Sequence, residues 1–152
     1  MQSSENIVRK AVKKYGKGRE NLLPILQMVR KENNYLSEDQ LREIATEMDL
    51  SAADVYGVAT FYSFMDMQPK GKNIIRICKT ITCFMKGKDS IVTALEDALG
   101  IKMGETTPDR KFSLLEANCI GWCHKGPAML INDKVYVELT PEKAIQALEE
   151  YR

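Results

Sequence analysis

The sequence predicts an α/β protein in two parts, a bundle of short helices followed by a domain with the element order βαβ-ββα. Apolar residues recur at helical spacing through residues 3–65, and a Pro-Lys-Gly segment at residues 69–71 then interrupts this pattern. Short runs rich in isoleucine and valine follow, as in buried strands. We therefore expect a helical domain at residues 1–69 and a second domain at residues 70–152.

Four short helices are expected in the first domain. Gly16 ends the first helix, and the second begins near residue 21 because Pro24 is tolerated only in a first turn. Ser37 and Gln40 have the spacing of a capping box at the start of the third helix, and Ser51 begins the fourth in a similar way. No catalytic group of residues is recognisable in these helices. We therefore expect this domain to dock onto a partner protein.

The fourth helix ends in a run of aromatic and methionine side chains. A surface for a partner protein is one interpretation of this run, but such residues at a helix end more often lie in a core. We therefore expect burial of the following side chains: Phe61, Tyr62, Phe64, Met65 and Met67.

The second domain is expected to combine strands and helices in one layered unit. Strands are predicted at residues 73–78, 111–118, 128–131 and 134–138. Gly100 ends a helix between the first two strands, and Thr140 caps a final helix that has Pro141 in its first turn. The resulting order, strand, helix, strand, strand, strand, helix, is that of the thioredoxin-like fold.

The four cysteines of the chain stand in two tight pairs. Cys78 and Cys83 occur in CKTITC, and Cys119 and Cys123 occur in CIGWC. Each pair lies where a predicted strand ends and a loop begins. A right-handed βαβ crossover makes these two strands parallel, so both loops leave the same edge of the sheet. We therefore expect the four thiolates to converge there, at the edge where α/β proteins usually bind ligands.

Three kinds of site use four cysteines in this way. Disulfides need an oxidising compartment, but the chain opens with MQSSENIVRK, which lacks the apolar segment of a signal peptide. Structural zinc usually takes two ligands from a C-x2-C turn, which is tighter than the C-x4-C and C-x3-C found here. A 2Fe-2S cluster has two irons and accepts ligands from two loops, and C-x4-C also occurs in plant-type ferredoxins. The spacing favours the cluster and leaves zinc as an alternative.

The residues beside the cysteines suit an anionic cluster. Four thiolates with an oxidised 2Fe-2S core carry a net charge of about −2, which nearby cations offset. Glycines let backbone N–H groups approach sulfur. His124, the single histidine, is expected outside the ligand set because four cysteines are available. The cations are Lys79, Lys86, Lys88 and Lys125, and the glycines are Gly87, Gly121 and Gly126.

The composition and motifs argue against several functions. The net charge is +1 with 28% charged residues, which does not indicate a nucleic-acid surface. No apolar run approaches the roughly 20 residues that span a bilayer, so we expect no membrane insertion. The chain has no glycine-rich dinucleotide motif after a strand, no C-x-x-C and no Ser/His/Asp arrangement. We therefore expect a cytoplasmic protein without catalytic residues of its own.

Five segments of the chain resemble the thioredoxin-like 2Fe-2S ferredoxin family: VYGVATFYSF, CKTITCFMKG, GETTPDRKFSLLEANCIGWC, KGPAMLIN and VYVELTPEKA. Within this family the chain is similar to the small subunit of complex I, the respiratory NADH dehydrogenase. It is also similar to the gamma subunit of NAD-linked multimeric hydrogenases, including electron-bifurcating ones, and of formate dehydrogenases. By this resemblance the residues that bind the 2Fe-2S cluster are Cys78, Cys83, Cys119 and Cys123.

The resemblance also implies a function. The chain would exchange single electrons with the FMN of an NADH-oxidising partner subunit, in a complex that holds further iron-sulfur clusters. The chain ends directly after its last predicted helix, as compact bacterial forms do. We therefore expect a soluble hydrogenase complex with a further hydrogenase or iron-sulfur subunit. Complex I and NAD-dependent formate dehydrogenase are alternatives, and a zinc-stabilised binding module is the alternative from a different class.

Overall fold

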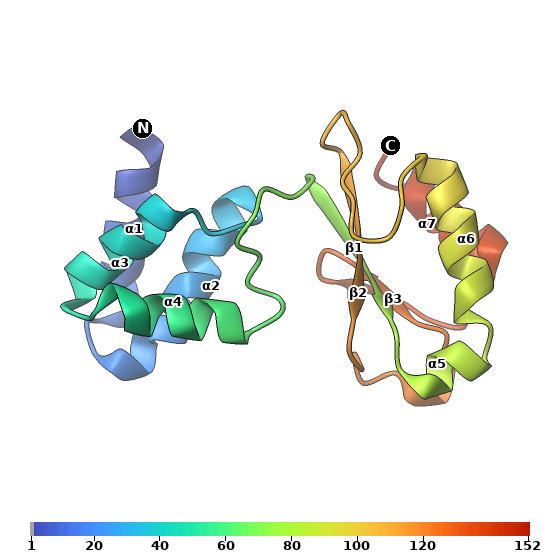
Figure 1. Ribbon diagram of the computed structural model, residues 1–152, viewed down its shortest axis with the longest axis horizontal. Helices are drawn as coiled ribbons and strands as arrows, with labels where there is room; N and C mark the ends of the chain where they lie inside the picture. Colours follow the sequence, from blue (N-terminus) through green and yellow to red (C-terminus); the bar gives the residue numbers. More distant parts are fainter. Residues whose placement is uncertain (1) are drawn as a thin grey trace. The chain divides into compact units, whose positions relative to one another are not determined.

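The computed structural model describes the backbone of residues 2–152 and the side chains of residues 7–152. The chain divides into two compact units, Met1–Pro69 and Lys70–Arg152. Figure 1 shows the first unit as helices and the second as a sheet with helices packed on it. The α/β class predicted from the sequence is therefore confirmed.

The first unit contains the four predicted helices and one short 3₁₀ turn. Ser37 and Gln40 form the expected capping box, with Gln40 N donating to Ser37 Oγ at 3.2 Å and Ser37 N donating to Gln40 Oε1 at 3.0 Å. Ser51 Oγ likewise accepts from Asp54 N at 3.0 Å. The elements are α1 (Gln2–Tyr15), η1 (Arg19–Asn21), α2 (Leu22–Asn33), α3 (Glu38–Met48) and α4 (Ala52–Phe61).

The core of the first unit takes one stripe of side chains from each helix. Val8 of α1, Ile25 of α2, Ile44 of α3 and Val55 of α4 are each 0% exposed. Burying each side chain of this size stabilises the fold by about 1.5–3 kcal/mol. These stripes follow the helical spacing seen in the sequence, so the unit has a hydrophobic core of its own.

The aromatic run after α4 lies largely on the surface. Phe61 is 79% exposed, Tyr62 is 42% exposed and Phe64 is 39% exposed, whereas Met65 is buried. The expectation of burial is therefore wrong for the three aromatic side chains. The helix ends before Tyr62, whose backbone is extended. The helical period consequently does not carry Tyr62 and Phe64 back to the core, and Phe61 is exposed at the last position of the helix.

The second unit is built on a mixed four-stranded sheet with the order β2-β1-β3-β4. β1 and β2 run parallel, with Asn73 opposite Phe112 and Cys78 opposite Ala117. β3 is antiparallel to both β1 and β4. The parallel pairing expected from a βαβ crossover is thus present. The strands are β1 (Asn73–Cys78), β2 (Phe112–Ala117), β3 (Met129–Ile131) and β4 (Lys134–Tyr136).

Two longer helices cover the sheet, and Figure 1 shows them beside each other on one of its sides. They are α6 (Lys88–Leu99) and α7 (Pro141–Glu149). Leu95 of α6 and Leu148 of α7 share a core with Ile75 and Ile77 of β1, all at most 1% exposed. Gly100 ends α6 in the left-handed conformation, as predicted. No helix in the described part of the chain has both the length and the apolar character needed to cross a bilayer.

The sequence did not predict α5 (Ile81–Met85), the short helix between β1 and α6. We expected Cys83 in a loop, but Cys83 lies in this helix. Five residues are too few to show a helical period, so the pattern of apolar residues could not reveal it. Gly87, at φ 92°, then separates α5 from α6.

Candidate metal centre

Two segments carry the cysteines to one edge of the sheet. The first cysteine loop (residues 78–87) leaves β1 at Cys78, and the second cysteine loop (residues 118–128) follows β2. Because Cys78 is opposite Ala117 in the parallel register, both loops begin at the same end of the second unit. Figure 1 shows this end beside α5. The backbone of Lys79 donates to Ala117 O at 2.9 Å and joins the two strand exits.

The structure brings together the four cysteines that the sequence singled out. Cys119 Sγ and Cys123 Sγ are 3.2 Å apart. The pKa of Cys123 is raised, first by this hydrogen bond and also by the negative charges of Cys119, Cys78 and Cys83. All four sulfur atoms therefore lie close enough to interact electrostatically. Cys78 and Cys83 are buried, Cys123 is partly buried and Cys119 is exposed.

Cys78 is held in an environment that favours its thiolate. Burial alone would raise the pKa of Cys78, but hydrogen bonds outweigh burial and lower it. The Thr80 hydroxyl lies 3.1 Å from Cys78 Sγ. The backbone N–H groups of Thr80 and Ile120 also contribute, and Ile120 belongs to the second cysteine loop. A thiolate with several donors is prepared for a cation or a cationic core.

Cys83 shows the opposite balance. Burial raises the pKa of Cys83, and the neighbouring Cys78 raises it further, against a hydrogen bond from the backbone of Ala128. Two buried thiols this close do not both ionise readily, because each thiolate raises the pKa of the other. A bound metal removes this obstacle because metal binding displaces the thiol protons. The arrangement therefore suits four thiolates around a positively charged group.

Backbone N–H groups from the second cysteine loop surround the sulfurs. Gly121 N donates to Cys119 Sγ at 3.4 Å, from a left-handed backbone at φ 88° that favours glycine. Ile120 and Ala128 supply the donors to Cys78 and Cys83. Side-chain chemistry could not point to these two residues, because they act through the main chain.

The glycines near the cysteines have three different roles. Gly121 donates to sulfur, as predicted. Gly126 lets its backbone approach Cys83, since a Cβ added there would lie 3.1 Å from Cys83 Sγ. Gly87 does not approach a sulfur, because the nearest neighbour of such a Cβ would be Ser90 Oγ at 3.8 Å. Its left-handed backbone before α6 explains the glycine instead.

The lysines near the site also differ from one another. Lys86 Nζ donates to the backbone carbonyls of Cys123 at 3.2 Å and of His124 at 3.5 Å. Lys88 pairs with Glu116 at 3.4 Å and with Asp89, so carboxylates neutralise its charge.

The His124 ring stacks on Trp122, with 5.7 Å between ring centroids and planes 24° apart.

The donor set consists of thiols, which are the usual ligands of an iron-sulfur cluster. Among the described side chains, no group of three or more His, Cys, Asp or Glu is arranged around one point to hold a metal ion. The cysteines instead form two pairs, one from each loop. A 2Fe-2S cluster can take one pair of ligands on each iron.

The similarity to known proteins extends over nearly the whole chain. The family model described as thioredoxin-like [2Fe-2S] ferredoxin matches residues 8–152. The chain belongs to this family. Its membership confirms the resemblance seen in the sequence motifs and makes one 2Fe-2S cluster its cofactor.

Individual relatives of this ferredoxin-family chain are bacterial NADH-quinone oxidoreductase proteins. The E subunit of this enzyme from Buchnera aphidicola subsp. Acyrthosiphon pisum is 41% identical over 147 residues, covering 97% of this chain and 91% of the relative. The E subunit of the Escherichia coli K12 enzyme is 41% identical over 127 residues, covering 84% and 76% respectively.

A solved structure is also similar. The crystal structure of an NAD+-reducing [NiFe]-hydrogenase in the air-oxidised state matches with a TM-score of 0.73 and 26% identity. The match covers 85% of this chain but only 22% of the hydrogenase chain. The ferredoxin-family chain thus corresponds to a fraction of that larger polypeptide.

The contact between Gly126 and Cys83 gives a first testable prediction. We expect Gly126→Ala to push Cys83 Sγ away from its position, because the new methyl group would overpack the buried thiol, at a cost of about 1–3 kcal/mol. The visible absorption and circular dichroism bands of the loaded protein should shift, and its iron content should fall. Gly104→Ala is the control. Gly104 has a left-handed backbone, so alanine there would strain the backbone, but no atom lies within 4 Å of the added Cβ. Equal spectra for the wild type and Gly126→Ala would contradict the prediction.

Proposed function

We propose that Cys78, Cys83, Cys119 and Cys123 bind one 2Fe-2S cluster and that the chain is an electron-transfer subunit of an NADH-oxidising complex. The observation that supports this most directly is the meeting of four thiols from two parallel strand exits, in a member of this ferredoxin family. The chain exchanges single electrons with the flavin of a partner subunit, which receives two electrons from NADH as a hydride.

The residues of the chain have separate parts in this function. The bound cluster supplies one-electron chemistry. Cys78 and Cys83 anchor it on the buried side, and Cys119 and Cys123 face the surface, where an electron can enter or leave. The N–H groups of Ile120, Gly121 and Ala128 stabilise negative charge on sulfur, and this charge increases when an electron is added. These donors therefore help to set the reduction potential.

The parent complex in this proposal is of the NADH-quinone oxidoreductase type. The two E subunits described above are each 41% identical to the chain, and the matches cover most of their own length. The hydrogenase that the sequence favoured is supported by a match of 26% identity to part of a larger chain. An NAD+-reducing hydrogenase complex is therefore the second candidate. A cytoplasmic location is part of the proposal because four free cysteines suit a reducing compartment.

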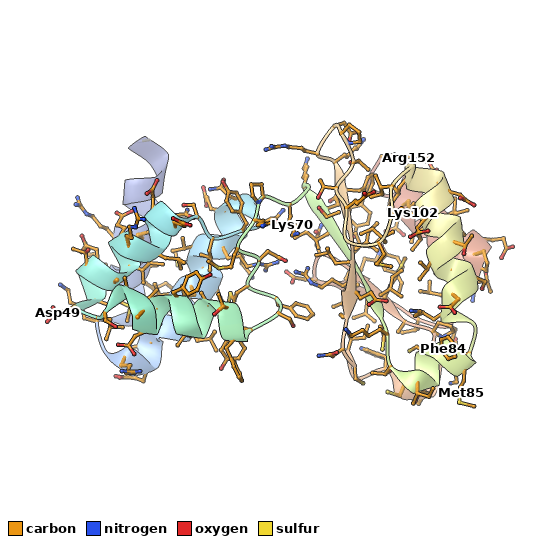
Figure 2. All side chains as sticks on the ribbon, in the orientation of Figure 1. Asp49, Lys70, Phe84, Met85, Lys102 and Arg152 are labelled. Atoms are coloured by element: carbon orange, nitrogen blue, oxygen red, sulfur yellow. The ribbon has the colours of Figure 1, made fainter. Side chains whose placement is uncertain are left out.

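The surface beside the cysteines is suited to contact another subunit. Ile81 is 66% exposed, Phe84 is 51% exposed and Met85 is 79% exposed, all on α5, and Trp122 is 37% exposed on the second cysteine loop. Figure 2 shows Phe84 and Met85 at the outer edge of the second unit. Exposed apolar side chains gathered in this way mark interaction sites. We assign this surface to the flavin-bearing subunit, since the electron must pass here.

The helical unit offers a second docking surface. Phe61, Tyr62 and Phe64 are exposed, and we call these three side chains the α4 aromatic face. A groove of 370 Å³ runs beside it, lined in part by the ion-paired Arg19 and Asp54. Aromatic residues and arginine are enriched at the centres of protein interfaces. The role of residues 1–69 as a docking domain rests on this surface.

The proposal is tested on protein purified without oxygen. We expect two irons and two sulfides per chain, a red-brown colour, and a rhombic paramagnetic signal that appears only on reduction. The chain alone should not oxidise NADH, because no nucleotide-binding motif is present in the sequence. Colourless protein with one tightly bound zinc would support the binding module instead. NADH oxidation by the isolated chain would refute the division of labour between the subunits.

A further inference from the structure

Lys86 joins the two cysteine loops through its side chain. It follows α5 directly, only three residues after Cys83. Its Nζ donates to the carbonyl oxygens of Cys123 and His124, across to the second cysteine loop. Its Cδ would lie 3.6 Å from a Cβ added at Gly126, so its methylene chain also passes close to that loop. Both the head and the stem of this lysine therefore reach the second cysteine loop.

The other links between the two cysteine loops are made by the cysteines and by backbone groups. Their strands separate after Cys78 and Ala117, and the second cysteine loop then contains only the 3₁₀ turn η2 (Cys123–Lys125). Backbone groups supply several links, among them the bond from Cys78 N to Ala128 O at 3.2 Å. Apart from the cysteines, no other described side chain of residues 78–87 forms a hydrogen bond to residues 118–128. Lys86 is therefore the side chain of the first loop that holds the backbone of Cys123.

The charge of Lys86 is not neutralised by an acidic side chain. Its Nζ donates to the two carbonyl oxygens, and among the described residues no carboxylate forms an ion pair with it. Lys88 differs in this respect, because Glu116 and Asp89 pair with it. The positive charge of Lys86 therefore lies against the carbonyl of Cys123, screened by solvent but not offset by a carboxylate in the described part of the chain. Such a charge stabilises the additional negative charge of a reduced site more than the oxidised site.

We propose that Lys86 is a positioning residue that holds the second cysteine loop on the end of α5. By fixing the backbone of Cys123, it keeps the second pair of thiolates at the separation from the first pair that a shared cluster requires. The same ammonium group raises the reduction potential of the centre. This inference rests on the proposed ligand set and concerns a residue outside that set.

The test compares three substitutions in the full-length, cluster-loaded chain. Lys86→Met keeps most of the length of the side chain but removes the charge and both hydrogen bonds. Lys86→Arg keeps a cation and donors. Lys79→Met is the matched control, because Lys79 lies next to Cys78 and, among the described side chains, has no hydrogen-bond or ion-pair partner. Lys86 is exposed, so none of these changes should disturb folding, which circular dichroism of each variant checks.

Three measurements separate positioning from a general loss of charge. They are the rate at which a chelator in excess bleaches the visible absorption, the g-values of the reduced centre, and its midpoint potential. We expect Lys86→Met to bleach about tenfold faster, since two charge-assisted hydrogen bonds are lost at an exposed site. Its g-values should change and its potential should fall. In Lys86→Arg the bleaching rate, the g-values and the potential should lie closer to those of the wild type. Lys79→Met should leave the bleaching rate and g-values unchanged.

Each outcome decides between the alternatives. Wild-type bleaching and g-values in Lys86→Met would overturn the inference while leaving the proposed function intact. Equal acceleration in Lys79→Met would show that charge alone matters, and this also overturns the positioning role. A wild-type chain that binds no iron and no sulfide would defeat the proposed function, and the inference with it.

Discussion

Cys119→Ser is expected to leave the protein with at least about tenfold less iron than the wild type after the same reconstitution. Losing one thiolate leaves an iron with too few ligands and opens the cluster to water and oxygen. Cys119 is the exposed member of the set, so the loss does not follow from a damaged core. Cys83→Ser should have the same effect from the buried side. Iron and sulfide analysis, with the visible spectrum, measures both variants.

His124→Ala is the control for these cysteine variants. The imidazole stacks on Trp122 instead of joining the cysteines, so its removal should leave the iron content unchanged. A folded Cys119→Ser protein is required for the comparison and can be verified by far-ultraviolet circular dichroism. The ligand assignment is wrong if His124→Ala loses the cluster while a cysteine variant retains it.

Replacing Phe61 and Tyr62 together by aspartate is expected to abolish co-purification with the flavin-bearing subunit. Aromatic side chains at the centre of an interface each contribute about 2 kcal/mol or more, so the double variant should bind about a thousandfold more weakly. Both side chains are exposed and line the groove beside the α4 aromatic face, so the substitutions do not empty the core. Iron content should remain that of the wild type, because the cysteines lie in the other unit.

Tyr56→Asp is the matched control for the docking variant. Tyr56 belongs to the same helix and is 54% exposed, but it does not line the groove. We therefore expect Tyr56→Asp to retain the complex. Deleting residues 1–68 should again abolish the complex and leave cluster assembly largely intact. Retention of the complex by the truncated chain would show that the helical unit is not the docking element.

Much of the fold could be predicted from the sequence because its signals are local. Ser37, Ser51 and Thr140 cap helices where their side chains were expected to do so. The convergence of the cysteine loops could also be predicted, since a βαβ crossover joins parallel strands, here β1 and β2. These conclusions need only helical or strand periods, capping spacing and one rule of chain topology.

Other features could not be predicted from local patterns. The aromatic residues at the end of α4 were expected in the core, because apolar residue types alone do not show that the helix stops at Phe61. The helix that carries Cys83 is too short to have a period. Among four lysines near the cysteines, the sequence could not distinguish Lys86, which reaches the second cysteine loop, from Lys88, which is neutralised by Glu116.

The sequence by itself determined the class of the fold, the order of its elements and the four cysteines as a set. These depend on periodicity, on spacing and on residue type, which are properties of the chain as written. Only the tertiary structure decided which groups surround each sulfur. Thr80, Ile120 and Ala128 approach the thiols through a hydroxyl or through backbone N–H groups, and Lys86 reaches carbonyls 37 and 38 residues away. Such contacts arise when distant segments pack together, and no spacing along the chain encodes them.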